Sequence, residues 1–327
     1  MKTVKNPGKK VRAKTKSKEV KLAGNPFLLP LLPLPVILVM TWFLYRQALD
    51  FRFTNWDDPT YVLENSAMQK FGPETIRHFF LHSSASNYHP LTMISLAADR
   101  HAATHGDKQP LTPDGPEAGR FHLTNILLHL FNIVLVYLFI LMLTERRWIP
   151  ATVTALLFAI HPMHAESVAW IAERKDVLYT FFFMASLLTY LRYAKKPAGW
   201  SYFLAFFFFT GSLLSKPSAV ILPLILWLID FFVNRPFTRR VWLEKIPFLL
   251  ASAAAGWTTL AIQSKIAMAD IGAFSVADRL LFGTYGFMMY VVKMIVPIGL
   301  SAFYPYPNLT ASGHLPLVFY LSPLFVV

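Results

Sequence analysis

Residues 177–193, VLYTFFFMASLLTYLRY, decide the fold of this chain. They form an apolar run close to the ~20 residues that cross ~30 Å of hydrocarbon as a helix. Similar runs lie on both sides of it, and several have a tryptophan near one end, as interfacial anchors do. These runs are residues 27–49, 126–143, 149–160, 202–214, 219–233 and 247–262. We therefore expect an all-α protein, a polytopic bundle of transmembrane helices.

The composition agrees with a membrane protein. Of 327 residues, 55% are hydrophobic and 15% are charged, which is not typical of a soluble domain. There is no cysteine, so disulfides and cysteine-based metal sites are excluded. The net charge is +13, but nine lysines and arginines lie within residues 1–21. A basic tail (1–26) before a first span meets anionic lipid on the cytoplasmic side, so we expect no nucleic-acid partner.

The charges between the runs predict the topology. Basic residues at 145–147, 192–196 and 235–245 indicate the cytoplasmic side. The first outer loop (50–121) and the turns 161–176 and 215–217 then lie outside. After Gln263 the alternation is ambiguous. Residues 279–296 either cross the membrane or lie in its outer interface as an amphipathic helix, and the side of residues 303–307 is undecided.

The first outer loop begins with two adjacent carboxylates, Asp57 and Asp58. Two carboxylates at a membrane boundary repel each other, which predicts a raised pKa for one of them and a capacity to accept a proton. The alternative is a solvated turn. Further along the loop, residues 72–82 and 91–103 predict short helices. Both are too short and too polar to span, so they either lie on the outer leaflet over a cavity or form a cap without chemistry.

The second apolar run carries a stripe of polar residues on one helical face, at His122, Asn125, His129 and Asn132. A polar stripe in a lipid-embedded helix either bonds to another helix or faces water. Two histidines one heptad apart are a poor metal chelate. The spacing therefore favours packing between helices.

The turn 161–176 concentrates charge between two apolar runs. It offers Glu166, Glu173 and Asp176 as acids and Arg174 and Lys175 as cations. These could simply neutralise one another at a helix start. However, outer cations break the positive-inside trend, and Lys216 in the next outer turn breaks it again. Two outer cationic sites suit an anionic head group. No nucleotide-binding motif is present, so a lipid-linked phosphate is the natural donor of a transferred group.

Several motifs follow one another along the chain. They are Asn55-Trp56-Asp57-Asp58, Asn87-Tyr88-His89-Pro90-Leu91-Thr92, Phe121-His122-Leu123-Thr124-Asn125, His161-Pro162-Met163-His164-Ala165-Glu166-Ser167-Val168-Ala169-Trp170, Glu173-Arg174-Lys175-Asp176 and Ser215-Lys216-Pro217. In this order they resemble one known family, the transmembrane and tetratricopeptide-repeat O-mannosyltransferases and their bacterial relatives, of the GT-C glycosyltransferase superfamily. The resemblance covers roughly residues 53–233, and the long motif beginning at His161 is its most specific part.

The resemblance implies a GT-C enzyme that moves a sugar, typically mannose, from a polyprenyl phosphate to a protein hydroxyl with inversion. Asp57 or Asp58 would be the general base, and Glu166 would orient acceptor or sugar. Arg174, Lys175 and Lys216 would stabilise the departing phosphate, and His89, His164 and Glu173 would also contact substrate. A divalent ion held with His89 or His164 is conceivable, but the family generally works without one, so no metal or other cofactor is expected.

Two other functions compete with this interpretation. A transporter or flippase of a lipid-linked sugar would bind the same cargo without reacting, and would need broken helices and an internal repeat. A membrane anchor for an active repeat domain would leave the outer charges unexplained. The chain stops at Val327 inside an apolar run, so we expect residues 27–327 to be a transmembrane domain followed by repeats in a longer protein. The short turns favour a bacterial inner membrane with a periplasmic site, or a lumenal site if the cell is eukaryotic.

Overall fold

The computed structural model describes residues 29–106, 110–264, 274–305 and 315–326, and within these ranges the chain is helical without named strands. The all-α prediction is confirmed. The expected basic tail at 1–26 lies outside the described residues. The α-helices are α1 Pro33–Tyr45, α2 Pro73–Leu81, α3 Pro90–Ala103, α4 Ala118–Leu143, α5 Trp148–Ile160, α6 Ala165–Ala169, α7 Arg174–Lys195, α8 Gly199–Ser215, α9 Leu222–Phe232, α10 Arg239–Leu243, α11 Ile246–Gln263, α12 Val276–Ile295, α13 Leu317–Leu321 and α14 Pro323–Val326.

Three helical stretches among the described residues are long and apolar enough to cross a membrane: Ala118–Leu143, Ile171–Lys195 and Arg239–Gln263. Shorter apolar helices occupy the other expected runs, including α5, α8 and Pro217–Phe232. The first run differs from its expected length, because α1 begins only at Pro33 and continues as a 3-10 turn from Arg46 to Asp50. Proline is favoured in the first turn of a helix, where its missing N–H costs nothing.

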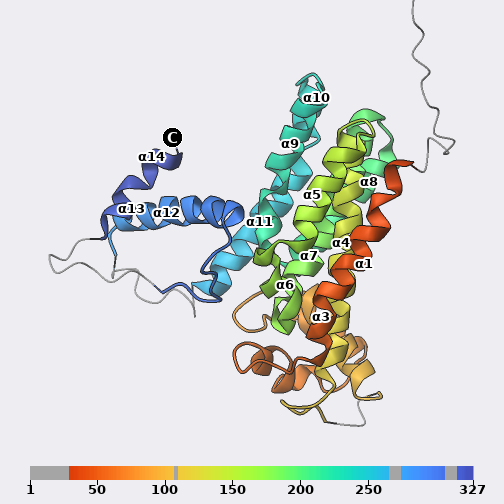
Figure 1. Cartoon of the computed structure of the whole chain (residues 1–327), viewed down its shortest axis with the longest axis vertical. Coiled ribbons are helices and arrows are strands. Elements are labelled where there is room, and N and C mark those ends of the chain that lie inside the picture. Colours follow the sequence, from red (N-terminus) through yellow and green to blue (C-terminus); the bar gives the residue numbers. More distant parts are fainter. Residues whose placement is uncertain (1–28, 107–109, 265–273, 306–314, 327) are drawn as a thin grey trace, which may run out of the picture.

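The long helices form one side-by-side bundle in which α4 and α7 are central (Figure 1). Three members of the predicted polar stripe on α4 bond to neighbouring segments, as the packing interpretation expected, whereas the fourth, His122, packs its ring against Phe51 of the first loop. Asn125 Nδ2 donates to Trp170 O at 2.9 Å, and Asn132 Nδ2 donates to Val177 O at 2.9 Å. His129 Nε2 lies 3.1 Å from Ala159 O on α5. These bonds fix α4 against both neighbours where an unpaired polar group would be costly.

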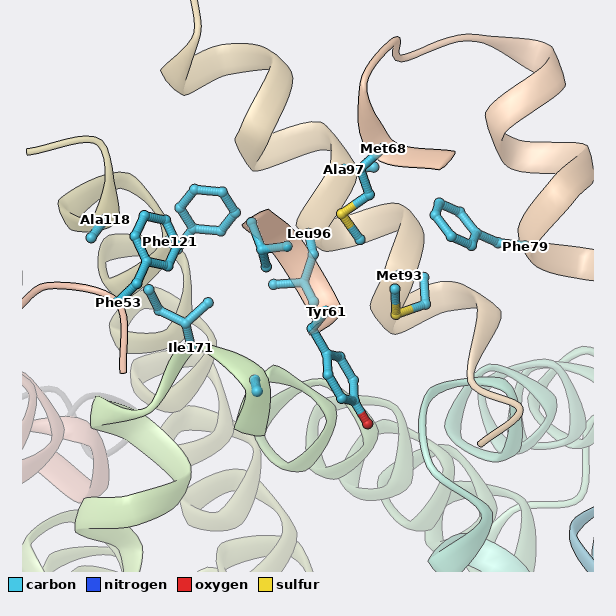
Figure 2. Packing of buried hydrophobic residues seen from close by; sticks show 12 residues of the cluster. Phe53, Tyr61, Met68, Phe79, Met93, Leu96, Ala97, Ala118, Phe121 and Ile171 are labelled. Carbon is cyan, nitrogen blue, oxygen red and sulfur yellow. The ribbon is translucent and has the colours of Figure 1, made fainter. Parts of the chain in front are cut away.

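A cap closes one end of the bundle, at the bottom of Figure 1, and contains α2, α3 and α6. Its core cluster joins Phe53, Tyr61 and Phe79 of the first loop to Phe121 and Ile171 of the bundle helices and turn (Figure 2). Each fully buried side chain of this size contributes about 1.5–3 kcal/mol. Both short helices expected in the first loop are present. Their position on a lipid leaflet remains a prediction.

The cap also approaches the bundle closely at Gly119, near the start of α4. A Cβ atom at this position would lie 2.7 Å from the carbonyl oxygen of Leu49. Only glycine allows the chain leaving α1 to pass this close to α4. The first loop is therefore anchored where it begins.

A buried ion pair anchors the start of α11. Lys245 Nζ lies 2.5 Å from Asp230 Oδ2, and neither side chain is exposed. Tyr190 donates its hydroxyl to the same carboxylate oxygen at 2.8 Å, and Arg235 Nη1 lies 3.3 Å from Oδ1. This cluster connects α7, α9 and the start of α11, so the whole of α11 is held against the bundle.

The C-terminal helices lie beside the bundle, and α12 runs crosswise to the bundle helices in Figure 1. No residue of α12 is buried. One contact with the cap is aromatic, because the Phe303 ring centroid lies 6.3 Å from that of Trp56. Phe303 therefore lies on the same side as the first loop, which the sequence left undecided. Among the described helices, α12 is not one of the three that are long and apolar enough to cross a membrane. Residues 265–273 between α11 and α12 lie outside the described ranges.

Candidate functional site

Asp58 connects the two loops that the sequence singled out. Its Oδ2 accepts from Thr54 N at 2.8 Å and Thr54 Oγ1 at 3.0 Å. Its Oδ1 accepts from Trp170 Nε1 at 3.0 Å and Ala172 N at 2.9 Å. Burial raises the pKa of Asp58, and these four bonds oppose that rise. The cause is therefore burial and not the predicted repulsion between adjacent carboxylates. With no exposed surface and both oxygens occupied, Asp58 holds the loops together.

Asp57 has a different environment although it is the next residue. It is half-buried, and its charge acts on Tyr61 and Lys175. Tyr61 stacks on His89, with ring centroids 5.4 Å apart and an interplanar angle of 14°. Asp57 therefore lies on the side of the loop that carries Lys175 and His89. Of the two predicted bases, Asp58 accepts four hydrogen bonds, whereas none to the Asp57 carboxylate is recorded among the described residues.

Charges from two separate turns meet beside these residues. Lys175 Nζ lies 2.8 Å from Glu173 Oε1, and Lys216 Nζ lies 3.9 Å from Glu173 Oε2. Lys216 also pairs with Asp176. The turns 161–176 and 215–217 thus contribute to one ionic network. This is the convergence on which the sequence-based prediction of an anion site depends.

A cavity of about 440 Å³ adjoins this network. It lies at the cap end of α8 and α11, and its mostly apolar wall carries two lysines and several polar side chains. Its lining residues are Asn87, His89, Lys175, Ser215, Lys216, Pro217, Ser218, Val220, Gly256, Thr259, Leu260 and Gln263. Three predicted substrate-binding residues, His89, Lys175 and Lys216, therefore share one cavity. The cavity has room for a sugar or a phosphate head group.

His89 is the most buried ionisable group of the cavity, with only 3% of its surface exposed. Its Nε2 has no hydrogen-bond partner among the described residues. Burial, and then the charges of Lys175 and Lys216, lower the pKa of His89 to about 3. The imidazole is therefore neutral at physiological pH. It can accept a hydrogen bond from a hydroxyl or donate one to an anion, but it adds no positive charge to the cavity.

A second cavity, of about 250 Å³, lies beside the first. Pro217 and Thr259 line both cavities. The other residues of the second cavity are Tyr88, Thr210, Leu213, Leu214, Ala251, Ala254, Ala255 and Thr258. Apolar side chains of α8 and α11 dominate this wall. A cavity with two cationic side chains thus adjoins one with none, a combination suited to an amphiphile with an anionic head.

Arg174 does not take part in this site, which corrects the role expected from sequence. The side chain is completely buried, and Nη2 lies 2.6 Å from Asp99 Oδ2 and 2.9 Å from Phe121 O. Nη1 donates to Ser95 Oγ at 2.7 Å, and Nε donates to Asn125 Oδ1. These partners use the donors of the guanidinium within the protein. Arg174 therefore joins α3, α4 and α7 and cannot reach a phosphate in the cavity.

Four other predicted site residues also lie outside the lining of both cavities: Asp57, His164, Glu166 and Glu173. Asp57 and Glu173 act on the lining residue Lys175 by their charge, which Glu166 and His164 do less directly or not at all. Glu166 is exposed, and partial burial and the charge of Asp176 raise its pKa. His164 packs against Phe158, with its Nδ1 at 2.7 Å from the Phe158 carbonyl oxygen and its ring 6.0 Å from that of His129. Burial lowers the pKa of His164. The expected substrate contacts of Glu166 and His164 have no support in their positions.

The sequence interpretation missed the wall of the cavity on α11. Gly256, Thr259, Leu260 and Gln263 line it at a spacing of i, i+3, i+4 and i+7, which is one helical face. Gln263 Nε2 donates to Asn87 Oδ1 at 3.2 Å, connecting α11 to the first loop. Small and polar residues on one face of an apolar helix are the signal that could have revealed this wall.

Comparison with known proteins shows which family this chain resembles. Residues 118–262 match the family described as "Dolichyl-phosphate-mannose-protein mannosyltransferase". This range, less than half of the chain, contains Lys175, Lys216 and all of α11 except Gln263, whereas Asp57 and His89 precede it. Together with the helical membrane fold, the match shows that the chain is similar to membrane O-mannosyltransferases over this range.

Matches to individual proteins show how far the resemblance extends. The chain is 47% identical over 73 residues to "Protein O-mannosyl-transferase TMTC1" of Homo sapiens, covering 22% of this chain and 8% of that protein. It is 32% identical over 116 residues to human TMTC2, covering 31% and 14%, and 28% identical over 157 residues to human TMTC4, covering 42% and 20%. The chain thus matches a fifth or less of the length of these relatives. No solved structure matches. The resemblance to O-mannosyltransferases stated from the motifs is confirmed.

Proposed function

We propose that this chain is the membrane part of a glycosyltransferase that moves a sugar, mannose, from a polyprenyl phosphate to a hydroxyl of a protein acceptor. The observation that supports the donor is that two cavities lie side by side, with Pro217 and Thr259 lining both. The first cavity, with Lys175 and Lys216, suits the phosphate and sugar. The second, apolar cavity suits the first isoprene units of the lipid. A soluble nucleotide sugar would have no use for the apolar half.

The reaction we propose is a single displacement at the anomeric carbon. Asp57 takes the proton of the acceptor hydroxyl as its oxygen attacks. The bond between the anomeric carbon and the phosphate oxygen breaks, and its electron pair leaves with the polyprenyl phosphate. Attack opposite to the leaving group inverts the anomeric configuration. Lys175 and Lys216 stabilise the negative charge that develops on the leaving phosphate. No step in this scheme requires a metal ion, so we expect a chelator to leave the rate unchanged.

Three features support Asp57 over Asp58 as the base. Asp57 is half-buried, its charge acts on Lys175, and no structural hydrogen bond to its carboxylate is recorded in the described residues. Asp58 is fully buried and accepts four hydrogen bonds. A base must be free to reach the acceptor and to receive its proton. We also propose that the chain crosses the membrane several times, in a bacterial inner membrane, with this site on the periplasmic side.

The test compares Asp57→Asn with Asp58→Asn in the full chain, using radiolabelled polyprenyl-phosphate mannose and a candidate protein acceptor. Asp57→Asn is expected to lower kcat about 10²–10⁴-fold without changing the thermal unfolding midpoint. Asp58→Asn is expected to lower that midpoint, because it removes charge from a buried hydrogen-bonded network. Asp114→Asn is the matched control, since this carboxylate of the same loop is 82% exposed.

Full activity of Asp57→Asn would remove the proposed base. The same labelled donor separates transfer from transport, which was the competing function. Movement of label across reconstituted vesicles, with no label attached covalently to protein, would favour a flippase. The structure offers a flippase little support, because the break between the 3-10 turn Pro217–Ile221 and α9 lies at the cap end of the helix and not at its middle.

A further inference from the structure

Tyr61 is a buried aromatic residue that the scheme above does not use. It lies in the short π-helical turn Pro59–Leu63, directly after Asp57 and Asp58, and is 3% exposed. Figure 2 shows its ring extending away from the other labelled side chains of the cap cluster, with the hydroxyl at the far end. Tyr61 therefore belongs to the cap core, and its ring lies directly behind two residues that line the cavity, Lys175 and His89.

Two cavity residues rest on this ring. Lys175 Nζ lies 5.1 Å from the ring centroid, within the range of a cation–π interaction. The His89 ring stacks on it almost in parallel, at 5.4 Å and 14°. Lys175 has one further recorded partner, Glu173, which Lys216 also approaches. The ring thus contacts both a cation and a neutral imidazole of the first cavity.

We propose that Tyr61 is a positioning residue: its ring fixes Lys175 and His89 in the cavity wall and so sets the affinity for the anionic head group of the donor. This inference rests on the proposed function, because it assumes that a phosphate occupies the cavity. A lysine side chain has about four rotatable bonds, so ordering it on binding a ligand costs conformational entropy. An aromatic face that already holds the ammonium lowers this cost, because the side chain is ordered before the ligand binds. The ring, and not the hydroxyl, supplies this effect.

The same geometry gives Lys175 two partners. Glu173 is shared between Lys175 at 2.8 Å and Lys216 at 3.9 Å. The electron-rich face of Tyr61 offers Lys175 a second partner that carries no formal charge. The ammonium is therefore held at the cavity wall from two sides, by the carboxylate and by the ring.

The test measures binding of farnesyl phosphate, a short polyprenyl phosphate, to the purified full chain by calorimetry. Tyr61→Phe keeps the ring and is expected to bind within twofold of the unaltered protein. Tyr61→Leu is expected to bind about tenfold more weakly, the scale of a partly desolvated cation–π contact. Phe79→Leu is the control for packing, because Phe79 is equally buried in the same cluster but does not line the cavity.

A double-mutant cycle with Lys175→Met separates positioning from general loss of packing. If Tyr61 acts through Lys175, the double variant is expected to bind at least fivefold better than the product of the single losses would give. Multiplicative losses, or an equal defect in Tyr61→Phe and Tyr61→Leu, would overturn the inference while leaving the proposed transferase intact. No binding of farnesyl phosphate by the unaltered protein would overturn the donor assignment, and the inference with it.

Discussion

Neutralising Asp99 tests whether Arg174 is a structural residue. Asp99 is 4% exposed and lies 2.6 Å from Arg174 Nη2, and Thr124 Oγ1 donates to it at 2.8 Å. The substitution Asp99→Asn preserves the shape of the side chain and removes its charge. A fully buried guanidinium then has no counter-charge within the network. Breaking a buried ion pair from one side costs about 3–5 kcal/mol.

That loss should appear in thermal unfolding of the detergent-solubilised protein, followed by tryptophan fluorescence. With about 2–4 °C per kcal/mol for a chain of this size class, we expect Asp99→Asn to lower the midpoint by roughly 10 °C. Arg120→Gln is the matched control. Arg120 Nε lies 3.3 Å from the same carboxylate, but its side chain is 49% exposed. Such a pair contributes at most about 1 kcal/mol, so the control should fall by no more than a few degrees.

A double variant completes the argument. Replacing both partners, as Asp99→Leu with Arg174→Met, removes the buried charges together and should recover most of the lost stability. It should also bind farnesyl phosphate about as well as the unaltered protein, because Arg174 does not line the cavity. An unchanged midpoint in Asp99→Asn would refute the buried pair. Loss of farnesyl phosphate binding in the stable double variant would restore Arg174 to the site.

Two further predictions concern the cavities. The pKa of His89 is about 3 in the folded protein and about 6.5 when unfolded, so the unfolded state binds more protons between these values. The free energy of unfolding should therefore fall as the pH drops below about 6.5, by up to about 1.4 kcal/mol per pH unit. His89→Asn should flatten that fall when unfolding is measured as a function of pH. An equal slope in both proteins would contradict the prediction. Ala254→Trp, which fills the apolar cavity, should raise KM for long-chain donors about tenfold in the transfer assay, whereas Ala253→Trp, outside its lining, should not. Equal KM values in the two variants would remove the lipid from this cavity.

The sequence by itself determined the helical membrane fold and the general location of the site. Apolar runs of spanning length predict helices, because a helix pairs the backbone N–H and C=O groups of a segment with one another where lipid offers them no partner. The stripe from His122 to Asn132 was readable as an interhelical contact, since helical spacing places its members on one face. The outer cations at Lys175 and Lys216 were readable because they violate the charge distribution that orients membrane proteins.

Only the tertiary structure decided how the two residues of each candidate pair differ. Arg174 and Lys175 are consecutive on α7, about 100° apart around the helix, so one enters the buried network while the other lines the cavity. Asp57 is half-buried, whereas Asp58 is fully buried and accepts hydrogen bonds from Trp170 and Ala172, more than a hundred residues later. The wall on α11 and the shared lining at Pro217 likewise come from segments distant in sequence. Composition and spacing give the residue types available, but the direction of each side chain depends on what packs against it.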